Sequence, residues 1–246
     1  MDLARWGFAD DTVVITGGGS GIGRATAIAC AALGLRVALW DIAADTAKAT
    51  IDALGVADSR SHLVIADVSD PDAVEAAFAD TITRLGPVRY LVNNAGPRAA
   101  DPYSFDDGMR LGAGSVELVT RSWLATAPPP DASIVNVASV AGNMVGTDPA
   151  WYGANKAAIA GYTRSMALAL APQVRVNAVA PSLVNTARTS KWTDSDLGRH
   201  WAEINPLQRW AVADDIAYPI VWLLSPLAGY INGVLLPVDG GQTLVL

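Results

Sequence analysis

The fold is decided by one stretch of the chain, Thr12-Val13-Val14-Ile15-Thr16-Gly17-Gly18-Gly19-Ser20-Gly21-Ile22-Gly23-Arg24. Its β-branched first part is typical of a buried strand, and the alanine-rich residues 25–33 predict a helix that stops at Gly34. Glycines in the turn between them tolerate positive φ and let the backbone approach a ligand closely. The N-terminus of the following helix offers unpaired N–H groups to a phosphate. The stretch predicts a nucleotide-binding turn, and a tight strand-to-helix connection is the alternative.

Composition excludes several classes of function. The 246 residues carry a net charge of −7, and Lys and Arg form no run, so nucleic acid is not an expected partner. Cys30 is the single cysteine, which rules out an internal disulfide and favours a small buried side chain. His62 and His200 are the two histidines and belong to no ligand-spaced cluster, so no metal site is expected.

The N-terminal residues 1–7 contain no basic region followed by a long apolar segment, and the chain has no unbroken apolar run of membrane-spanning length. We therefore expect a cytoplasmic protein that contacts no membrane.

Strand and helix patterns alternate along the chain. This alternation predicts an α/β fold, a Rossmann-like doubly wound parallel sheet of about seven strands with helices on both faces. The expected strands are residues 12–16, 35–40, 62–66, 88–92, 133–137, 174–179 and 234–238, and the expected helices include 25–33, 44–54, 71–85, 152–170 and 214–225. The proline-rich residues 127–131 indicate a rigid surface turn, so residues 1–246 are expected to form a single domain.

Three residues with proton-transfer chemistry follow the strand at 133–137. Ser139 stands just past that strand, and Tyr152 and Lys156 stand four residues apart on the helix predicted at 152–170, so they share one face. Taken alone, such a Tyr/Lys pair is an ordinary pair on a helix surface.

Together these motifs resemble the short-chain dehydrogenase/reductase family. Residues 16–23, TGGGSGIG, are similar to its cofactor turn TGxxxGxG, residues 93–96, NNAG, to its signature beside the cofactor ribose, and Ser139, Tyr152 and Lys156 to its catalytic Ser and Tyr-x-x-x-Lys. Residues 177–186 resemble NxxxPGxVxT, and the pattern continues almost to the C-terminus. The resemblance therefore covers essentially the whole chain.

The resemblance implies a binding site for NAD(H). Its members place the cofactor against the glycine turn, the Asp-Val pair at 67–68, and the segment that ends at Thr186. The implied cofactor-binding residues are Gly17, Ser20, Gly21, Ile22, Gly23, Asp41, Asp67, Val68, Asn94, Ala95, Gly96, Tyr152, Lys156, Pro181, Val184 and Thr186.

Asp41 indicates which cofactor is preferred. It lies eighteen residues past Gly23, where a carboxylate accepts hydrogen bonds from a ribose 2′-hydroxyl and repels a 2′-phosphate. A helix-capping role is the alternative. Ser20 and Ile42 stand where a basic partner for that phosphate is expected, so NAD is favoured over NADP.

The catalytic trio addresses the need to move a proton during hydride transfer. A phenol with a pKa of about 10 is poorly matched to neutral pH, so the pKa of Tyr152 must fall. The Lys156 ammonium and the positive charge of oxidised nicotinamide both favour phenolate. Ser139 hydrogen-bonds the substrate oxygen. The expected reaction interconverts a secondary alcohol and a ketone on a moderately apolar small-molecule substrate.

The chain departs from the family pattern at two positions. Ser182 replaces a glycine of NxxxPGxVxT, which costs about 1 kcal/mol or more if positive φ is required. Gly112 aligns with the asparagine of the family's catalytic tetrad, whose backbone carbonyl holds a water on the proton path. Because glycine keeps the carbonyl, the enzyme is expected to turn over, and Gly112→Asn is expected to change the rate less than about tenfold.

Residues 187–210 correspond to a mobile substrate lid in relatives, and Trp192, Trp201 and Trp210 suggest that it is apolar. Tryptophans that fill core or interface space are the alternative. The family also implies a homotetramer, or a dimer, built on the helices that bear Gly112 and Tyr152. Two other functions stay open: a catalytically silent nucleotide-binding or scaffold protein, and an epimerase or dehydratase of the same superfamily.

Overall fold

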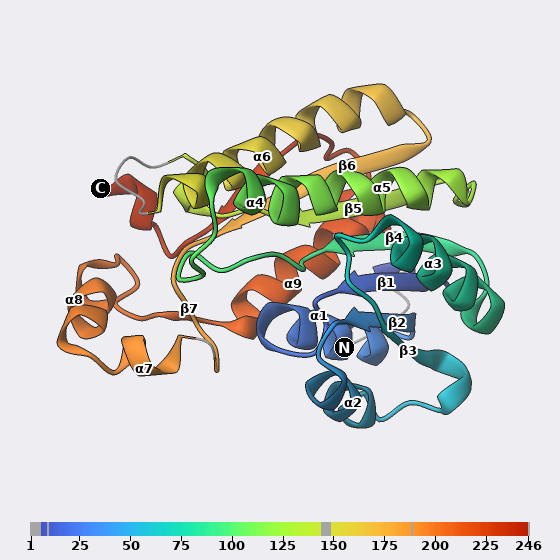
Figure 1. Ribbon diagram of the computed structural model, residues 1–246, viewed down its shortest axis with the longest axis horizontal. Helices are drawn as coiled ribbons and strands as arrows, with labels where there is room; N and C mark the ends of the chain where they lie inside the picture. The colour runs from blue at the N-terminus through green and yellow to red at the C-terminus, as the bar shows by residue number, and fades with distance from the viewer. Residues whose placement is uncertain (1–5, 9, 144–148, 188, 246) are drawn as a thin grey trace.

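The computed structural model describes residues 6–8, 10–143, 149–187 and 189–245. Its centre is a parallel sheet of seven strands in the order β3-β2-β1-β4-β5-β6-β9 (Figure 1). The strands are β1 Thr12–Thr16, β2 Arg36–Asp41, β3 Ser61–Ile65, β4 Val88–Asn93, β5 Ala132–Val137, β6 Val174–Pro181 and β9 Leu235–Val238. The predicted doubly wound sheet is confirmed, and its strand bounds agree with those expected from the sequence to within about two residues.

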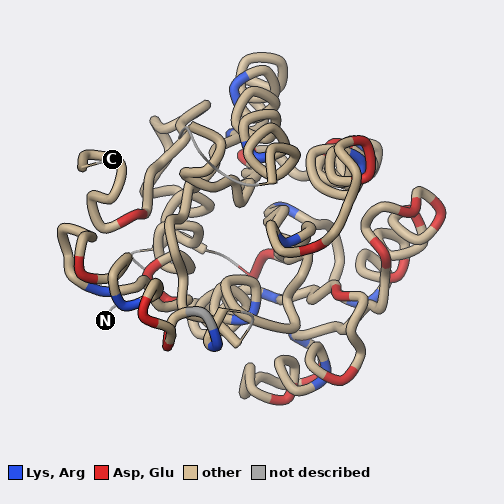
Figure 2. Tube along the Cα trace, turned by 60° about the vertical axis from the view of Figure 1, so that its left-hand side comes forward, with Lys and Arg blue, Asp and Glu red and all other residues tan. Residues whose placement is uncertain are grey.

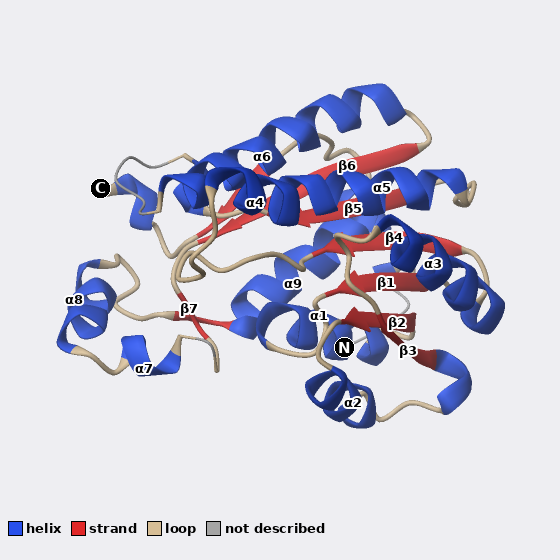
Figure 3. Ribbon diagram, in the orientation of Figure 1, coloured by secondary structure: helices blue, strands red, loops and turns tan. Residues whose placement is uncertain are grey.

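The helices connect successive strands, as Figure 3 shows. They are α1 Gly21–Ala32, α2 Ala44–Ala53, α3 Pro71–Leu85, α4 Phe105–Met109, α5 Ser115–Ala125, α6 Ala150–Leu170, α7 Ser190–Thr193, α8 Asp196–Ile204 and α9 Ala213–Leu224. A π-helical turn, η3 Arg110–Gly114, joins α4 to α5, and the short turn η4 Val140–Gly142 follows β5.

Each strand divides its side chains between the two faces of the sheet. In β1, Val13 and Ile15 pack in a core with α1, α2 and α9, whereas Val14 packs in a second core with α3, α5 and α6. Both cores contain large buried residues, such as Ile216 on the first face and Trp123 on the second. Cys30 lies fully buried in the first core, as predicted. Because both faces are covered, most strand residues are apolar and buried.

The strand order reverses between β1 and β4, and this reversal locates the ligand-binding edge. All neighbouring strands are parallel, so their carboxyl ends share one edge, and the arrows in Figure 3 point toward the side on which α7 and α8 lie. Ligands of open parallel sheets bind beyond the carboxyl ends, where the order reverses. The glycine turn after β1 and the NNAG segment after β4 both lie at this point.

A small second ladder was not predicted. Strand β7, Val184–Asn185, pairs with β8, Ala211–Val212, and the two bracket the predicted lid at 187–210. The segment predicted to form the lid thus contains α7 and α8, and its two ends are tied together by this ladder. It contains Arg188, which lies outside the described residues.

Charged positions are scattered over the outer helices, and in Figure 2 neither sign gathers over one large face. In the described part of the chain, no helix combines the length and hydrophobicity needed to span a bilayer.

Close packing behind the glycine turn yields a stability prediction. A Cβ on Gly23 would lie 2.2 Å from the Gly17 carbonyl oxygen, whereas a Cβ on Gly161 in α6 meets nothing within 4 Å. We expect Gly23→Ala to lower the free energy of unfolding by about 1–3 kcal/mol through overpacking. Gly161→Ala should raise it by up to about 1 kcal/mol, since alanine is the better helix former. Urea unfolding of both variants checks this, and equal stability of the two would contradict it.

Candidate active site

The ends of β1 and β4 are joined by a compact set of hydrogen bonds. The Thr16 hydroxyl accepts the backbone N–H groups of Asn94 and Ala95, each at 3.0 Å. The Asn94 side-chain amide donates to the carbonyls of Thr16 and Gly17 at 2.9 and 3.0 Å. The first motif residue after β4 therefore holds the glycine turn in place, and the two predicted cofactor segments form one unit.

Glycine is required in this turn for two reasons. Gly17 has φ +64°, a conformation that L side chains rarely adopt, and a Cβ on it would lie 2.9 Å from the Ala95 Cα. Gly21 has φ +52°, and a Cβ there would meet the Thr186 methyl at 3.3 Å. Ser20 precedes α1 and its hydroxyl makes no capping hydrogen bond. The structure thus brings the glycine turn, Thr186 and the N-terminus of α1 together, which fits the pyrophosphate of a dinucleotide.

Asp41 ends β2 beside this turn and is buried. Its Oδ2 accepts the Gly19 N–H at 2.8 Å and its Oδ1 accepts the Ala43 N–H at 2.9 Å. A carboxylate has about four lone-pair sites, so acceptor capacity remains for a ribose hydroxyl. The position of Asp41 is compatible with the predicted contact to a ribose hydroxyl. The hydrogen bond from the Ala43 N–H shows that the carboxylate also stabilises the turn after β2.

Asp67 and Val68 follow β3 at the same edge. The Asp67 carboxylate is exposed and accepts both the N–H and the hydroxyl of Ser69 at 2.8 Å. Val68 packs against the second core. Asp67 thus shapes the turn that leads to α3, and its adenine contact stays a prediction.

Ser139, Tyr152 and Lys156 come together beyond β5. The Ser139 side chain hydrogen-bonds Tyr152, and the Lys156 Nζ lies 5.7 Å from the centre of the Tyr152 ring. The Ser139 Oγ also lies 3.4 Å from the Pro181 carbonyl oxygen. Two of these residues belong to α6 and the third to the turn after β5, so tertiary packing assembles the trio that the sequence predicted.

Burial shifts the pKa of both titratable members of the trio. Lys156 is buried, its Nζ donates to the Val137 carbonyl at 2.9 Å, and burial lowers its pKa from 10.5 to about 8. Burial raises the pKa of the Tyr152 phenol above its ordinary value of 10, although the Ser139 hydrogen bond lowers it in part. The sequence predicted a phenol pKa that falls; here burial outweighs the hydrogen bond, so the pKa is raised.

The segment that ends at Thr186 is folded by a residue that the sequence did not single out. The Thr189 hydroxyl donates to the Val184 carbonyl at 2.7 Å and accepts the Thr186 N–H at 2.9 Å. The spacing of the two threonines is typical of a local side-chain turn and was the available signal. Ser182 is not among the described non-glycine residues with positive φ, so its replacement of glycine carries no such strain.

The tryptophans of the lid have different surroundings. The Trp210 indole N–H donates to the Gly198 carbonyl at 3.0 Å and so ties the end of the lid to α8. Trp201 is half-buried in α8, and the Trp192 side chain lies outside the described part of the structure. Asn205, which the sequence also did not single out, donates from its amide to the Asp239 carbonyl at 2.9 Å and anchors the lid to the C-terminal segment.

Gly112 lies at the centre of the π-helical turn, an irregularity between α4 and α5. Its carbonyl already accepts the Ser115 hydroxyl at 2.8 Å and the Ser115 N–H. A Cβ on Gly112 would lie 2.0 Å from the Nδ2 of Asn155. A side chain at position 112 would therefore require the buried Asn155 amide to move, a cost that the expected tolerance of Gly112→Asn did not include.

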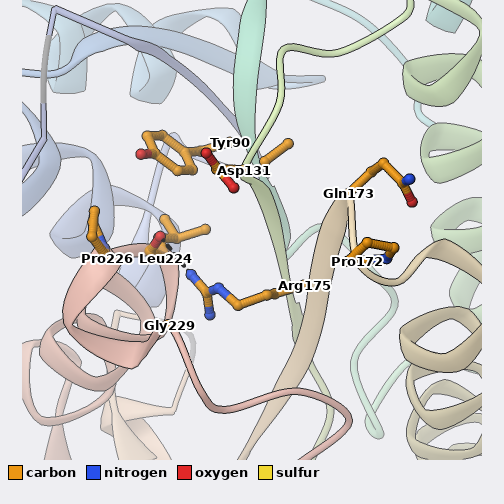
Figure 4. A pocket seen from close by; sticks show the side chains of 9 residues that line it. Tyr90, Asp131, Pro172, Gln173, Arg175, Leu224, Pro226 and Gly229 are labelled. Atoms are coloured by element: carbon orange, nitrogen blue, oxygen red, sulfur yellow. Dashed lines mark hydrogen bonds between the residues drawn. The ribbon is translucent and has the colours of Figure 1, made fainter.

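A cavity of about 280 Å³ lies away from these residues, near the amino ends of β4, β5 and β6. In Figure 4 the Arg175 side chain extends toward Leu224, and its guanidinium donates to the carbonyls of Leu223 and Leu224 at 2.8 and 3.0 Å. These bonds give Arg175 a structural role. Within the described ranges, no group of His, Cys, Asp and Glu side chains is arranged to hold a metal ion.

Comparison with known proteins agrees with this geometry. The family profile described as enoyl-(acyl carrier protein) reductase matches residues 17–243. The crystal structure of a short-chain dehydrogenase/reductase, glucose/ribitol dehydrogenase from Brucella melitensis, superimposes with a TM-score of 0.89 at 30% identity over 96% of this chain and 97% of that one. The chain belongs to the short-chain dehydrogenase/reductase family. Members of this family generally use NAD(P)(H).

Characterised relatives in this family include oxidoreductases of similar length. Meso-2,3-butanediol dehydrogenase from Serratia marcescens is 36% identical over 96% of this chain and 96% of its own. Levodione reductase from Leifsonia aquatica is 33% identical over 96% of this chain and 95% of its own. These relatives support oxidoreductase activity for this member of the family.

The buried lysine makes stability depend on pH. Its folded pKa of about 8 lies below the unfolded value of 10.5, so between these values the unfolded chain binds more protons and stability rises with pH. Relative to Lys156→Met, the wild type should gain up to about 1.4 kcal/mol per pH unit in that window. Urea unfolding across the window measures the difference. The exposed Lys48→Met serves as control, and a flat difference for Lys156→Met would contradict the burial.

Proposed function

We propose that this protein is an NAD(H)-dependent oxidoreductase that interconverts a secondary alcohol and a ketone. The observation that carries the proposal is the trio beyond β5, in which Ser139 hydrogen-bonds Tyr152 and Lys156 lies on the same face of α6. A hydroxyl donor, a phenol and an ammonium in this arrangement supply what proton transfer at a carbinol oxygen requires. The physiological direction is left open by these residues.

The chain's own residues handle the proton. Bound NAD would accept a hydride from the carbinol carbon, and NADH would return it. Tyr152 takes the hydroxyl proton in alcohol oxidation and gives it to the carbonyl oxygen in ketone reduction, while Ser139 donates a hydrogen bond to that oxygen. Since burial raises the phenol pKa, positive charge from Lys156 and from the oxidised cofactor must offset it.

The preference for NAD is proposed from the surroundings of Asp41. The carboxylate is held by the N–H groups of Gly19 and Ala43 at the mouth of the glycine turn. Ile42, the next residue, is exposed and uncharged, so no cation there would offset the charge of a 2′-phosphate. Repulsion by Asp41 then disfavours NADP.

Several finer features belong to the same proposal. The chain would act as one NAD(P)-binding domain with a lid at 187–210, a moderately apolar substrate, a cytoplasmic location and a homotetrameric or dimeric assembly. The lid is supported by the β7–β8 ladder at its base and by exposed apolar side chains on and near α8, Leu197 and Leu207. The competing function is a catalytically silent nucleotide-binding protein. It stays an alternative because Gly112 stands where the family has the asparagine of its catalytic tetrad.

Tyr152→Phe tests the proton role. The variant keeps the ring but lacks the transferable proton, so turnover should fall by orders of magnitude while NAD binding stays near that of the wild type. Steady-state kcat on the best of a panel of cyclic, aryl and aliphatic secondary alcohols and an NAD binding titration measure the two effects. Tyr162→Phe, on the same helix, should retain turnover. Retained turnover in Tyr152→Phe, or absence of wild-type turnover with tight NAD binding, would refute the proposal.

Asp41→Ser tests the cofactor preference. Loss of the carboxylate should weaken NAD binding and relieve the repulsion of NADP, which narrows the ratio of kcat/KM for the two cofactors. The exposed Asp45→Ser, in the first turn of α2, is the matched control and should leave the ratio unchanged. A wild type that already prefers NADP would contradict the role of Asp41.

A further inference from the structure

Helix α6, which carries the catalytic tyrosine and lysine, touches α4 and η3 through two glycines. A Cβ on Gly108 would lie 2.4 Å from the Cε3 of Trp151, and a Cβ on Gly112 would lie 2.0 Å from the Nδ2 of Asn155. The glycines are four residues apart, as are their partners, so each pair lies on one face of its helix. Each partner directly precedes a catalytic residue on α6. This contact therefore sets the position of the catalytic face.

The Asn155 amide is the polar part of this contact. The residue is fully buried, and its Oδ1 accepts the Ala113 N–H, which belongs to the π-helical turn, at 2.6 Å. Its Nδ2 makes no hydrogen bond to any residue that the structure describes. Alanine at this position would remove the unpaired Nδ2 but would also leave the Ala113 N–H without this acceptor. The Asn155 amide therefore ties α6 to the π-helical turn.

Lys156 is held on its other side by the turn that carries the catalytic serine. A Cβ on Gly142 would lie 2.7 Å from the Lys156 carbonyl carbon, so the turn lies directly against the α6 backbone. The Lys156 Nζ donates to the Val137 carbonyl at the end of β5. The backbone at Lys156 thus packs against η4, and the side chain of the preceding residue, Asn155, packs against η3.

We propose that Asn155 is a positioning residue for Lys156, because its amide ties α6 to the π-helical turn at Gly112 directly beside that lysine. The two residues are a matched pair, because the Asn155 amide occupies the space that a side chain at position 112 would enter. The inference rests on the proposed function, since the position of Lys156 matters for catalysis only if Tyr152 transfers a proton.

Three variants test the pair: Asn155→Ala, Gly112→Asn, and the double variant. Asn155→Ala should lower kcat at least about tenfold, with the dissociation constant for NAD within about threefold of the wild type. Gly112→Asn should lose both kcat and thermal stability, because its side chain collides with Asn155. The double variant should recover most of both, because the amide then comes from the opposite helix.

A readout that needs no turnover is the ionisation of Lys156, followed as the pH dependence of the unfolding free energy relative to the matched Lys156→Met variant. The described groups that its Nζ faces are the Val137 carbonyl and the Tyr152 ring. If Asn155→Ala releases Lys156 toward water, the titration midpoint should rise from about 8 toward 10.5 and return in the double variant. Thr163→Ala is the control: Thr163 is also buried on α6 and hydrogen-bonded to Asn136, so its loss should lower stability without moving the midpoint.

The outcomes separate the two proposals. An Asn155→Ala variant that behaves like Thr163→Ala, with lower stability but unchanged kcat and Lys156 titration, would overturn the positioning role. A double variant no better than Gly112→Asn would overturn the matched pair. Absence of wild-type turnover would instead count against the proposed function, while the titration and the thermal unfolding would still decide the role of Asn155.

Discussion

The position of the proposed catalytic trio depends on close contacts that glycines make with α6. Gly108 and Gly112 lie against the side chains of Trp151 and Asn155, and Gly142 lies against the α6 backbone, so a Cβ on any of the three would lie between 2.0 and 2.7 Å from atoms of α6. Packed interiors leave no room for even one extra carbon. A helix held this tightly presents Tyr152 and Lys156 at fixed positions toward the carboxyl ends of the strands.

The same burial that fixes the trio also opposes its chemistry. Removal from water disfavours the charged forms of both groups, which lowers the pKa of Lys156 to about 8 and raises that of Tyr152. Either group is therefore harder to ionise here than it would be in water. Burying Lys156 and Tyr152 where their charged forms are disfavoured costs folding stability, which is typical of functional sites.

At the carboxyl ends of the strands, a few side-chain hydrogen bonds hold the backbone of the predicted cofactor-binding segments. Thr16 and Asn94 are 78 residues apart in the chain, yet they satisfy one another's polar groups and position the glycine turn. Asn94 thus acts on the backbone of the turn, and Thr189 acts in the same way on Val184 and Thr186. Some residues at the carboxyl ends of the strands, such as Asn94 and Thr189, therefore act by holding the backbone of neighbouring segments in position.

The sequence by itself determined the strand and helix order, the doubly wound sheet and the candidate trio, because hydrophobic periodicity and glycine spacing are local properties of the chain. It could not determine why Gly112 is a glycine. The close contact of Gly112 is with Asn155, on another helix, and a contact between helices leaves no periodic signal in either one. The direction of the Tyr152 pKa shift likewise depends on burial by distant segments, and only the tertiary structure decides how much water reaches a side chain.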